Sequence, residues 1–175
     1  MEFYRTICAD LSRLGPVTVG NFFRQMFLPR GNVFPYIFWL RVVAKLRQTK
    51  ALKYTLHPIA YFMMRHYEFK YGIHANPNIY IGPGLHIVHG GCVFLNCENI
   101  GRDFTVYQGV TLGSGTRTDS LPWVEDSVTI YTGAVIYGHV RLHTGAIVGC
   151  NSVVARDVAS NTTVVGAPAR EIRRK

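Results

Sequence analysis

A six-residue hydrophobic period in the second half of the chain restricts its fold more than any other feature. Apolar anchors recur at every sixth position, with one miss at Thr118: Ile100, Val106, Leu112, Val124, Ile130, Ile136, Leu142, Val148 and Val154. A period of six matches neither the 3.6 residues of an α-helical turn nor the 3.5 residues of a coiled coil. A short fixed repeat of this kind is typical of a solenoid, and six residues per repeat predict a parallel β-helix.

The residues around each anchor fit the sides and corners of such a coil. Positions four residues after the anchors are small or apolar, and Phe104 is the one large side chain among them. Positions three residues after the anchors mostly hold residue types that accept tight turns and left-handed backbone: Asp103, Gly109, Ser127, Gly133, His139, Gly145, Asn151 and Asp157. Between Ile73 and Ile100 the period slips before Ile81 and again before Ile100, which predicts bulged corners at these two places.

The chain divides into three predicted parts. Residues 1–72 form an N-terminal helical region, residues 73–160 form the β-helix, and residues 161–175 form a basic tail. Turn-forming residues at 113–123 predict a loop extruded from the β-helix, because Leu112 and Val124 are two full periods apart. Four helices are predicted in the N-terminal region, over residues 3–14, 18–28, 36–53 and 58–70. The expected fold class is therefore mainly β, a β-helix solenoid preceded by helices.

Charge and cysteine content set expectations for partners and compartment. The formal net charge is +9, and residues 1–73 contribute +8 of it, from eleven basic and three acidic residues. This basic region is rich in aromatics, so it predicts either packing on the first coil or a partner chain, or peripheral contact with an anionic membrane. No nucleic-acid-binding motif accompanies it. The four cysteines show no metal-ligand spacing and are interpreted as buried free thiols of a cytoplasmic protein.

Three motifs lie in order along the repeat: IGPGLHIVHG at residues 81–90, YQGVTLG at 107–113 and VGAPAR at 165–170. Together with the repeat they resemble the hexapeptide-repeat acyltransferases, and most closely the serine acetyltransferase branch with its polysaccharide O-acetyltransferase relatives. The resemblance covers residues 73–170, more than half of the chain. It implies that the β-helix is left-handed, that the protein is a homotrimer, and that acetyl-coenzyme A is the acyl donor, bound between neighbouring subunits.

The resemblance also implies roles for individual residues. His89 matches the catalytic histidine, and an imidazole is a suitable base for taking the proton of a hydroxyl that attacks a thioester. The family orients this histidine with a carboxylate fifteen residues earlier, where this chain has His74. His74 therefore either orients His89 or has no catalytic role. Glu68 is a possible replacement for the carboxylate, and the sequence does not show whether its side chain reaches the site. Transfer is expected to be direct, with the rival nucleophile Cys92 interpreted as a buried structural thiol.

Further positions match those that hold the coenzyme in the family. The backbone N–H of Gly113 would face the thioester oxygen, and the backbone of Gly133 and Ala134 would line the pantetheine arm. Pro168 and Arg170 would border the adenine end. Arg173, Arg174 and Lys175 either meet the coenzyme phosphates or form a solvated basic tail.

The expected acceptor is a sugar hydroxyl of a surface polysaccharide, with serine as the alternative. Serine acetyltransferases hold serine with an aspartate before the catalytic histidine and an Arg-His pair in the extruded loop. The matching positions here are Val88, Ser120 and Leu121, which carry no charge. A lipid-diphosphate-linked saccharide would also suit the basic, aromatic N-terminal region.

Two other classes of protein remain as alternatives. Related β-helices include zinc carbonic anhydrases, and four histidines are available as ligands: His86, His89, His139 and His143. His86 and His89 are expected to face opposite sides of a strand, however, so no metal site is predicted. A non-catalytic assembly subunit would need neither His89 nor the motif at residues 165–170.

Overall fold

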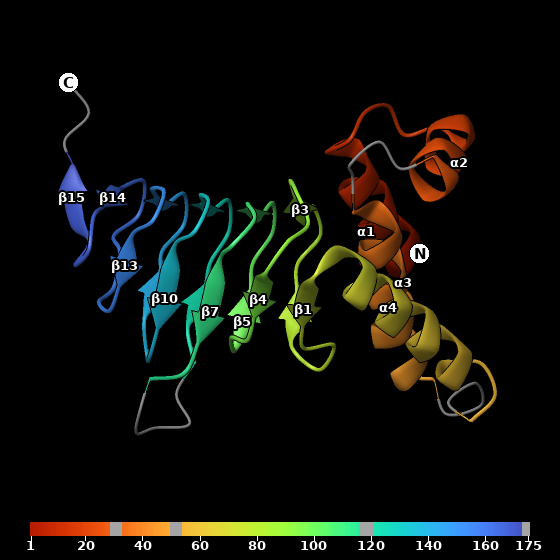
Figure 1. Cartoon of the computed structure of the whole chain (residues 1–175). Coiled ribbons are helices and arrows are strands. Elements are labelled where there is room, and N and C mark those ends of the chain that lie inside the picture. The colour runs from red at the N-terminus through yellow and green to blue at the C-terminus, as the bar shows by residue number, and fades with distance from the viewer. Residues whose placement is uncertain (29–32, 50–53, 116–120, 173–175) are drawn as a thin grey trace.

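A parallel β-helix forms the larger part of the molecule, and four helices gather at the end where its first coil begins (Figure 1). The computed structural model describes residues 1–28, 33–49, 54–115 and 121–172. The helices are α1 (Glu2–Ser12), α2 (Val19–Phe27), α3 (Phe34–Arg47) and α4 (His57–Tyr71). The predicted fold class, a β-helix with an N-terminal helical region, is confirmed, and the β-helix has about five turns.

The strands stack into three sheets, one for each side of the coil, which we name A, B and C. Sheet A contains β1 (Ile73–Ala75), β4 (Val93–Leu95), β7 (Thr111–Gly113), β10 (Val135–Tyr137) and β13 (Val153–Val154). Sheet B contains β2 (Tyr80–Ile81), β5 (Asn99–Ile100), β8 (Trp123–Val124) and β11 (Arg141–Leu142). Sheet C contains β3 (His86–Ile87), β6 (Thr105–Val106), β9 (Thr129–Ile130), β12 (Ile147–Val148), β14 (Thr163–Val165) and β15 (Arg170–Ile172).

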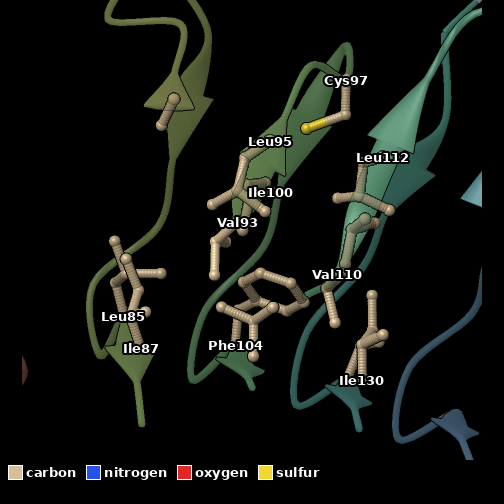
Figure 2. Packing of buried hydrophobic residues seen from close by; sticks show 14 of the residues in the cluster. Leu85, Ile87, Val93, Leu95, Cys97, Ile100, Phe104, Val110, Leu112 and Ile130 are labelled. Atoms are coloured by element: carbon tan, nitrogen blue, oxygen red, sulfur yellow. The ribbon is translucent and has the colours of Figure 1, made fainter. Parts of the chain in front are cut away.

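The predicted anchors fill the interior of the coil. None of the nine anchors is more than 2% exposed. Figure 2 shows three of them, Ile100, Leu112 and Ile130, among the buried side chains of successive coils. Phe104 is also fully buried and occupies the interior beside Val110 and Ile130. Successive strands pair in parallel, with Leu112 beside Ile136 and Ile136 beside Val154. The hydrophobic period therefore reports the register of the coils directly.

Two of the predicted left-handed corners differ in the structure. Gly138, not its neighbour His139, has the positive φ of 80°, because glycine meets no Cβ clash in that conformation. Asp157 also lacks a positive φ; its carboxylate instead accepts a hydrogen bond from the Arg141 N–H at 2.8 Å. The other six predicted corners have positive φ values: Asp103, Gly109, Ser127, Gly133, Gly145 and Asn151.

A buried ion pair fastens the helices to the first coil. The Asp10 carboxylate of α1 is fully buried and accepts from Arg41 of α3, with Nε to Oδ2 at 2.9 Å and Nη2 to Oδ1 at 3.1 Å. The same carboxylate accepts from the backbone N–H groups of Gly84 (2.8 Å) and Leu85 (2.9 Å). Arg41 also donates to the carbonyl oxygens of Ile81 and Gly82. Two helices and one corner of the β-helix thus share one satisfied polar cluster.

The ends of several elements differ from their predicted bounds. The third helix ends at Arg47, and residues 50–53 of the predicted segment lie outside the described residues, as do residues 116–120 of the predicted loop. Residues 163–172, predicted as part of a tail, form β14 and β15, which pair antiparallel and extend sheet C. None of the described helices is long and apolar enough to cross a bilayer.

Candidate active site

His89 lies on a widened corner between sheet C and sheet A. Register pairs Ile87 with Val106 and Leu95 with Leu112, so the chain takes eight residues from Ile87 to Leu95 but six over the same corner of the next coil. The hydrophobic period was predicted to slip before Ile81 and before Ile100, and these predicted positions were therefore partly wrong. Val93 is fully buried, as an anchor would be, but Leu95 is the residue that pairs in register with Leu112 of the next coil. The two extra residues place His89 on an exposed bulge.

The C-terminal end of α4 lies directly beneath this bulge. The Tyr71 carbonyl accepts from the Gly91 N–H at 2.7 Å, and the Gly72 carbonyl accepts from the Val93 N–H at 3.0 Å. A Cβ at Gly90 would lie 2.7 Å from the Tyr71 oxygen, so only glycine permits this close approach. The C-terminal end of a helix carries partial negative charge and favours a nearby cation.

Glu68 reaches His74, which the sequence left open. Glu68 lies in the last turn of α4 and is 6% exposed. Its Oε1 lies 2.7 Å from His74 Nδ1 and 2.6 Å from Arg65 Nη1. A carboxylate only accepts hydrogen bonds, so the proton of this contact belongs to His74 Nδ1, and in a neutral imidazole the other ring nitrogen is then an acceptor. Glu68 and Arg65 therefore fix the tautomer of His74.

His74 belongs to the coil beneath the His89 corner. It pairs in register with Phe94 in β4, five residues after His89, and its ring lies 6.2 Å from that of Phe94. Among the described residues of one protomer, no hydrogen bond joins His74 to His89, and the imidazole of His89 has no hydrogen-bond partner. The roles of His89 and His74 stay predictions.

His86 is a half-buried neighbour of this corner. Burial lowers the pKa of His86, and the charges of Arg13 and His89 lower it further. Arg13 extends from the end of α1 to sheet C, where its Nη2 donates to Thr105 Oγ1 at 2.7 Å, beside His86 in register. His143 lies apart, at the edge of sheet B, with its Nδ1 3.1 Å from Glu125 Oε1. In the part of the chain that the structure describes, no three His, Cys, Asp or Glu side chains gather as metal ligands.

Two of the predicted coenzyme-binding residues share the His89 edge. Gly133 and Ala134 occupy the corner between sheets C and A two coils further on, about 10 Å along the stack. The position of Gly133 has a structural reason as well: its φ is 71°, and a Cβ there would lie 2.2 Å from Asn151 Oδ1. The side chain of Ala134 is fully buried, which leaves its backbone for any ligand.

The other predicted coenzyme residues lie further from this edge. Gly113 ends β7 at the opposite side of sheet A, where it pairs with Tyr137. Pro168 and Arg170 are exposed near the C-terminal end of the stack, and Arg170 pairs with Val165 in sheet C. Arg173, Arg174, Lys175 and Ser120 lie outside the described residues.

The prediction of buried thiols was wrong for Cys92 and Cys150. Both are exposed, whereas Cys97 is fully buried and its pKa is raised by burial to about 12. Cys92 has a positive φ of 52° because it takes the corner position that Gly109 occupies in the next coil. The interpretation as a buried thiol rested on the absence of metal-ligand spacing among the cysteines, which does not report the position of Cys92 on a corner.

The chain is similar in sequence to serine acetyltransferases over part of its length. It is 40% identical to the serine acetyltransferase of Staphylococcus aureus over 110 residues, which cover 61% of this chain. The matched segment spans 51% of that relative, about half of its length. No protein-family profile matches the chain.

The fold is similar to that of solved serine acetyltransferases over nearly the whole chain. The Neisseria gonorrhoeae enzyme superposes with a TM-score of 0.77 at 25% identity, covering 99% of this chain and 67% of its own. The soybean enzyme, solved in complex with serine, superposes with a TM-score of 0.76 at 27% identity, covering 97% of this chain and 69% of its own.

Proposed function

The chain is a member of the hexapeptide-repeat acyltransferase superfamily with a serine acetyltransferase-like β-helix, and we propose that it is an acetyl-coenzyme A-dependent O-acetyltransferase. The observation that best supports this function is the corner of His89. An exposed imidazole lies there on a two-residue bulge, above the end of α4 and the Glu68–His74 pair. An exposed imidazole is accessible to a hydroxyl acceptor, and imidazole is the side chain that most often acts as a general base.

The reaction is a direct transfer. The ring nitrogen of His89 takes the proton of the acceptor hydroxyl while the hydroxyl oxygen attacks the acetyl carbonyl carbon. The carbon–sulfur bond of the resulting tetrahedral intermediate then breaks, and the leaving coenzyme A sulfur takes the proton back from the imidazolium. Gly113 N–H is the proposed donor to the carbonyl oxygen. Gly133, Ala134, Pro168 and Arg170 are the proposed contacts of the coenzyme.

Two observations favour different acceptors. The relatives in sequence and fold are serine acetyltransferases, and this supports L-serine, the alternative of the sequence analysis, better than a polysaccharide. A specific observation favours a sugar hydroxyl as the second candidate. The side chain before His89 is Val88, half-buried and uncharged, where the resemblance expects an aspartate for the amino group of serine.

Coenzyme A release with each class of acceptor tests the function. The purified protein is supplied with acetyl-coenzyme A and either L-serine or a panel of free and nucleotide-linked sugars, and the free thiol is measured. Turnover on serine would support the first candidate, and turnover on sugars alone would support the second. If the protein binds coenzyme A but releases thiol with every acceptor only at the rate of acetyl-coenzyme A hydrolysis, the proposed acetyltransferase activity is contradicted.

Glu68→Gln is expected to lower kcat at least tenfold with little change in the KM for acetyl-coenzyme A. The amide can donate as well as accept, so it no longer fixes the tautomer of His74. The loss should stay below the roughly 10⁴-fold that follows removal of a carboxylate bonded directly to a catalytic histidine. Glu98→Gln is the matched control, because Glu98 is exposed. An unchanged kcat would show that the Glu68–His74 pair is structural only.

The exposed apolar helices require partners, and we propose two. Phe62 (71% exposed) and Phe69 (75%) on α4 would pack against neighbouring subunits of a homotrimer, since α4 ends at the His89 corner. Val19 (74%) and Phe27 (70%) on α2 would lie on an anionic membrane, because Arg24 lies between them. Failure to sediment with anionic vesicles would remove the membrane contact, and a monomer in light scattering would remove the trimer.

A further inference from the structure

We propose that the outer face of sheet B is a saccharide-binding surface, separate from the acetyl-transfer site. Four side chains share one outward column across this sheet. Register places Tyr80 beside Asn99, Asn99 beside Trp123, and Trp123 beside Arg141. Tyr80 is 61% exposed and Trp123 is 36% exposed. Two aromatic rings are therefore presented to solvent two coils apart, about 10 Å, with an amide between them.

A hollow of about 420 Å³ lies over this column, and it contains both aromatic residues and hydrogen-bonding groups. Its lining comprises Tyr80, Asn99, Gly101, Arg102, Trp123, Glu125, Asp126 and Thr144. Gly101 lies in the lining where two coils approach closely, because a Cβ there would lie 2.5 Å from both Asp126 Oδ1 and the backbone carbonyl carbon of Glu125. The coil next to it carries Gly82 at the corresponding position, where a Cβ would lie 2.6 Å from the Gly101 carbonyl, so the coils stack closely along this edge of the hollow.

The polar groups around the rings are held in place before any ligand binds. Glu125 accepts from the Thr144 N–H at 3.0 Å and from Thr144 Oγ1 at 3.2 Å, and it also contacts His143. The Arg141 guanidinium lies 5.2 Å from the Trp123 ring centroid, a cation–π contact. Preorganisation of this kind lowers the entropy that a ligand loses on binding.

The chemistry of the lining matches a saccharide. A sugar ring has a C–H face that stacks on an aromatic face, and a rim of hydroxyls that donate to carboxylates and accept from amide and guanidinium groups. Two cations, Arg102 and Arg141, lie among two anions, Glu125 and Asp126, so the hollow does not select a highly charged ligand such as a nucleic acid. Its volume is also within the range of small-molecule sites.

The groove continues beyond Tyr80, which indicates a chain of sugars rather than one ring. Tyr80 also lines an adjoining hollow of about 610 Å³, between α1, α3 and the first coil. Asn78, Lys45 and Gln48 provide further hydrogen-bonding groups there. Tyr80 thus lies between two hollows, where an oligosaccharide can extend from Trp123 to the end of α3.

This surface lies on a different side of the coil from His89. His89 occupies the corner between sheets C and A, whereas the aromatic column belongs to sheet B. The inference therefore does not depend on which acceptor is acetylated. Acetyl-coenzyme A turnover tests the proposed function, and saccharide binding tests this surface, so either one can fail alone.

A glycan array of bacterial surface saccharides, followed by tryptophan fluorescence, tests the proposal. The full chain is applied to the array, and an oligosaccharide that binds is titrated into a Trp39→Phe variant, in which Trp123 is the one remaining tryptophan. We expect a saturable change in emission. Trp123→Ala and Tyr80→Ala should each weaken array binding about tenfold or more. Tyr131→Ala is the matched control, because Tyr131 is also 36% exposed but lies at the edge of sheet C.

Three results would overturn the proposal. The first is the absence of binding to any saccharide on the array. The second is binding that neither Trp123→Ala nor Tyr80→Ala weakens relative to Tyr131→Ala. The third is a change of oligomeric state in Trp123→Ala, measured by light scattering, which would make the face a contact between copies of the chain.

Discussion

His89→Ala is expected to lower kcat for acetyl transfer by about 10²- to 10⁴-fold, the usual contribution of a general base. The substitution removes an exposed side chain that is hydrogen bonded to no described residue, so the fold should not change. Coenzyme A binding should persist, because the proposed coenzyme contacts are other residues. The effect is measured as thiol release at saturating acetyl-coenzyme A.

His66→Ala is the control for this variant, since His66 is an exposed histidine on α4 outside the proposed site. Its kcat should equal that of the wild type. Retention of wild-type turnover by His89→Ala would remove His89 as the base. Loss of turnover in Cys92→Ala with intact coenzyme binding would instead indicate a covalent acetyl-enzyme, because Cys92 is exposed on the same corner.

Asp10→Ala is expected to lower the free energy of unfolding by about 3–5 kcal/mol. The substitution leaves the Arg41 guanidinium, 8% exposed, without its carboxylate. It also removes the acceptor of the Gly84 and Leu85 N–H groups, which are buried. A buried donor without an acceptor retains its full desolvation penalty. Urea unfolding monitored by circular dichroism measures the change.

Two further variants separate the ion pair from a general effect of removing aspartate. Asp157→Ala should cost only about 0.5–1.5 kcal/mol, because Asp157 is exposed and accepts one backbone hydrogen bond. Asp10→Leu combined with Arg41→Met should be more stable than Asp10→Ala, since no buried charge is left unpaired. A loss below 1 kcal/mol in Asp10→Ala would mean that the pair does not fasten the helices.

The structure changes how the first coil of the β-helix is understood. Val93 and Leu95 are both fully buried, so hydrophobicity alone did not show which residue continues the ladder. The choice decides whether the His89 corner is regular or contains two extra residues. Only the pairing of Leu95 with Leu112 resolves it, and the same pairing explains why Cys92 is exposed and not buried.

The carboxylate that contacts His74 was only partly predictable. The position of the family's carboxylate is occupied by His74 in this chain. The sequence suggested Glu68 as a replacement but did not show whether its side chain reaches the site. The two residues are six apart, but one ends a helix and the other begins a strand, so their separation depends on the angle at Gly72. The structure brings Glu68 Oε1 to 2.7 Å from His74 Nδ1. Whether the pair acts on His89 stays a prediction.

The sequence by itself determined the β-helix, because a six-residue period is a local pattern that each coil repeats. It also located His89 and the three motifs that carry the family resemblance, which are short and contiguous. The tertiary structure alone decided the features that join distant residues: Asp10 with Arg41, Glu68 with His74, and the Tyr80–Trp123 column of sheet B. These contacts depend on how the helices dock on the first coil and on the register between coils. The hydrophobic period carries no signal for the docking of the helices, and its slips leave the register of the first coil open.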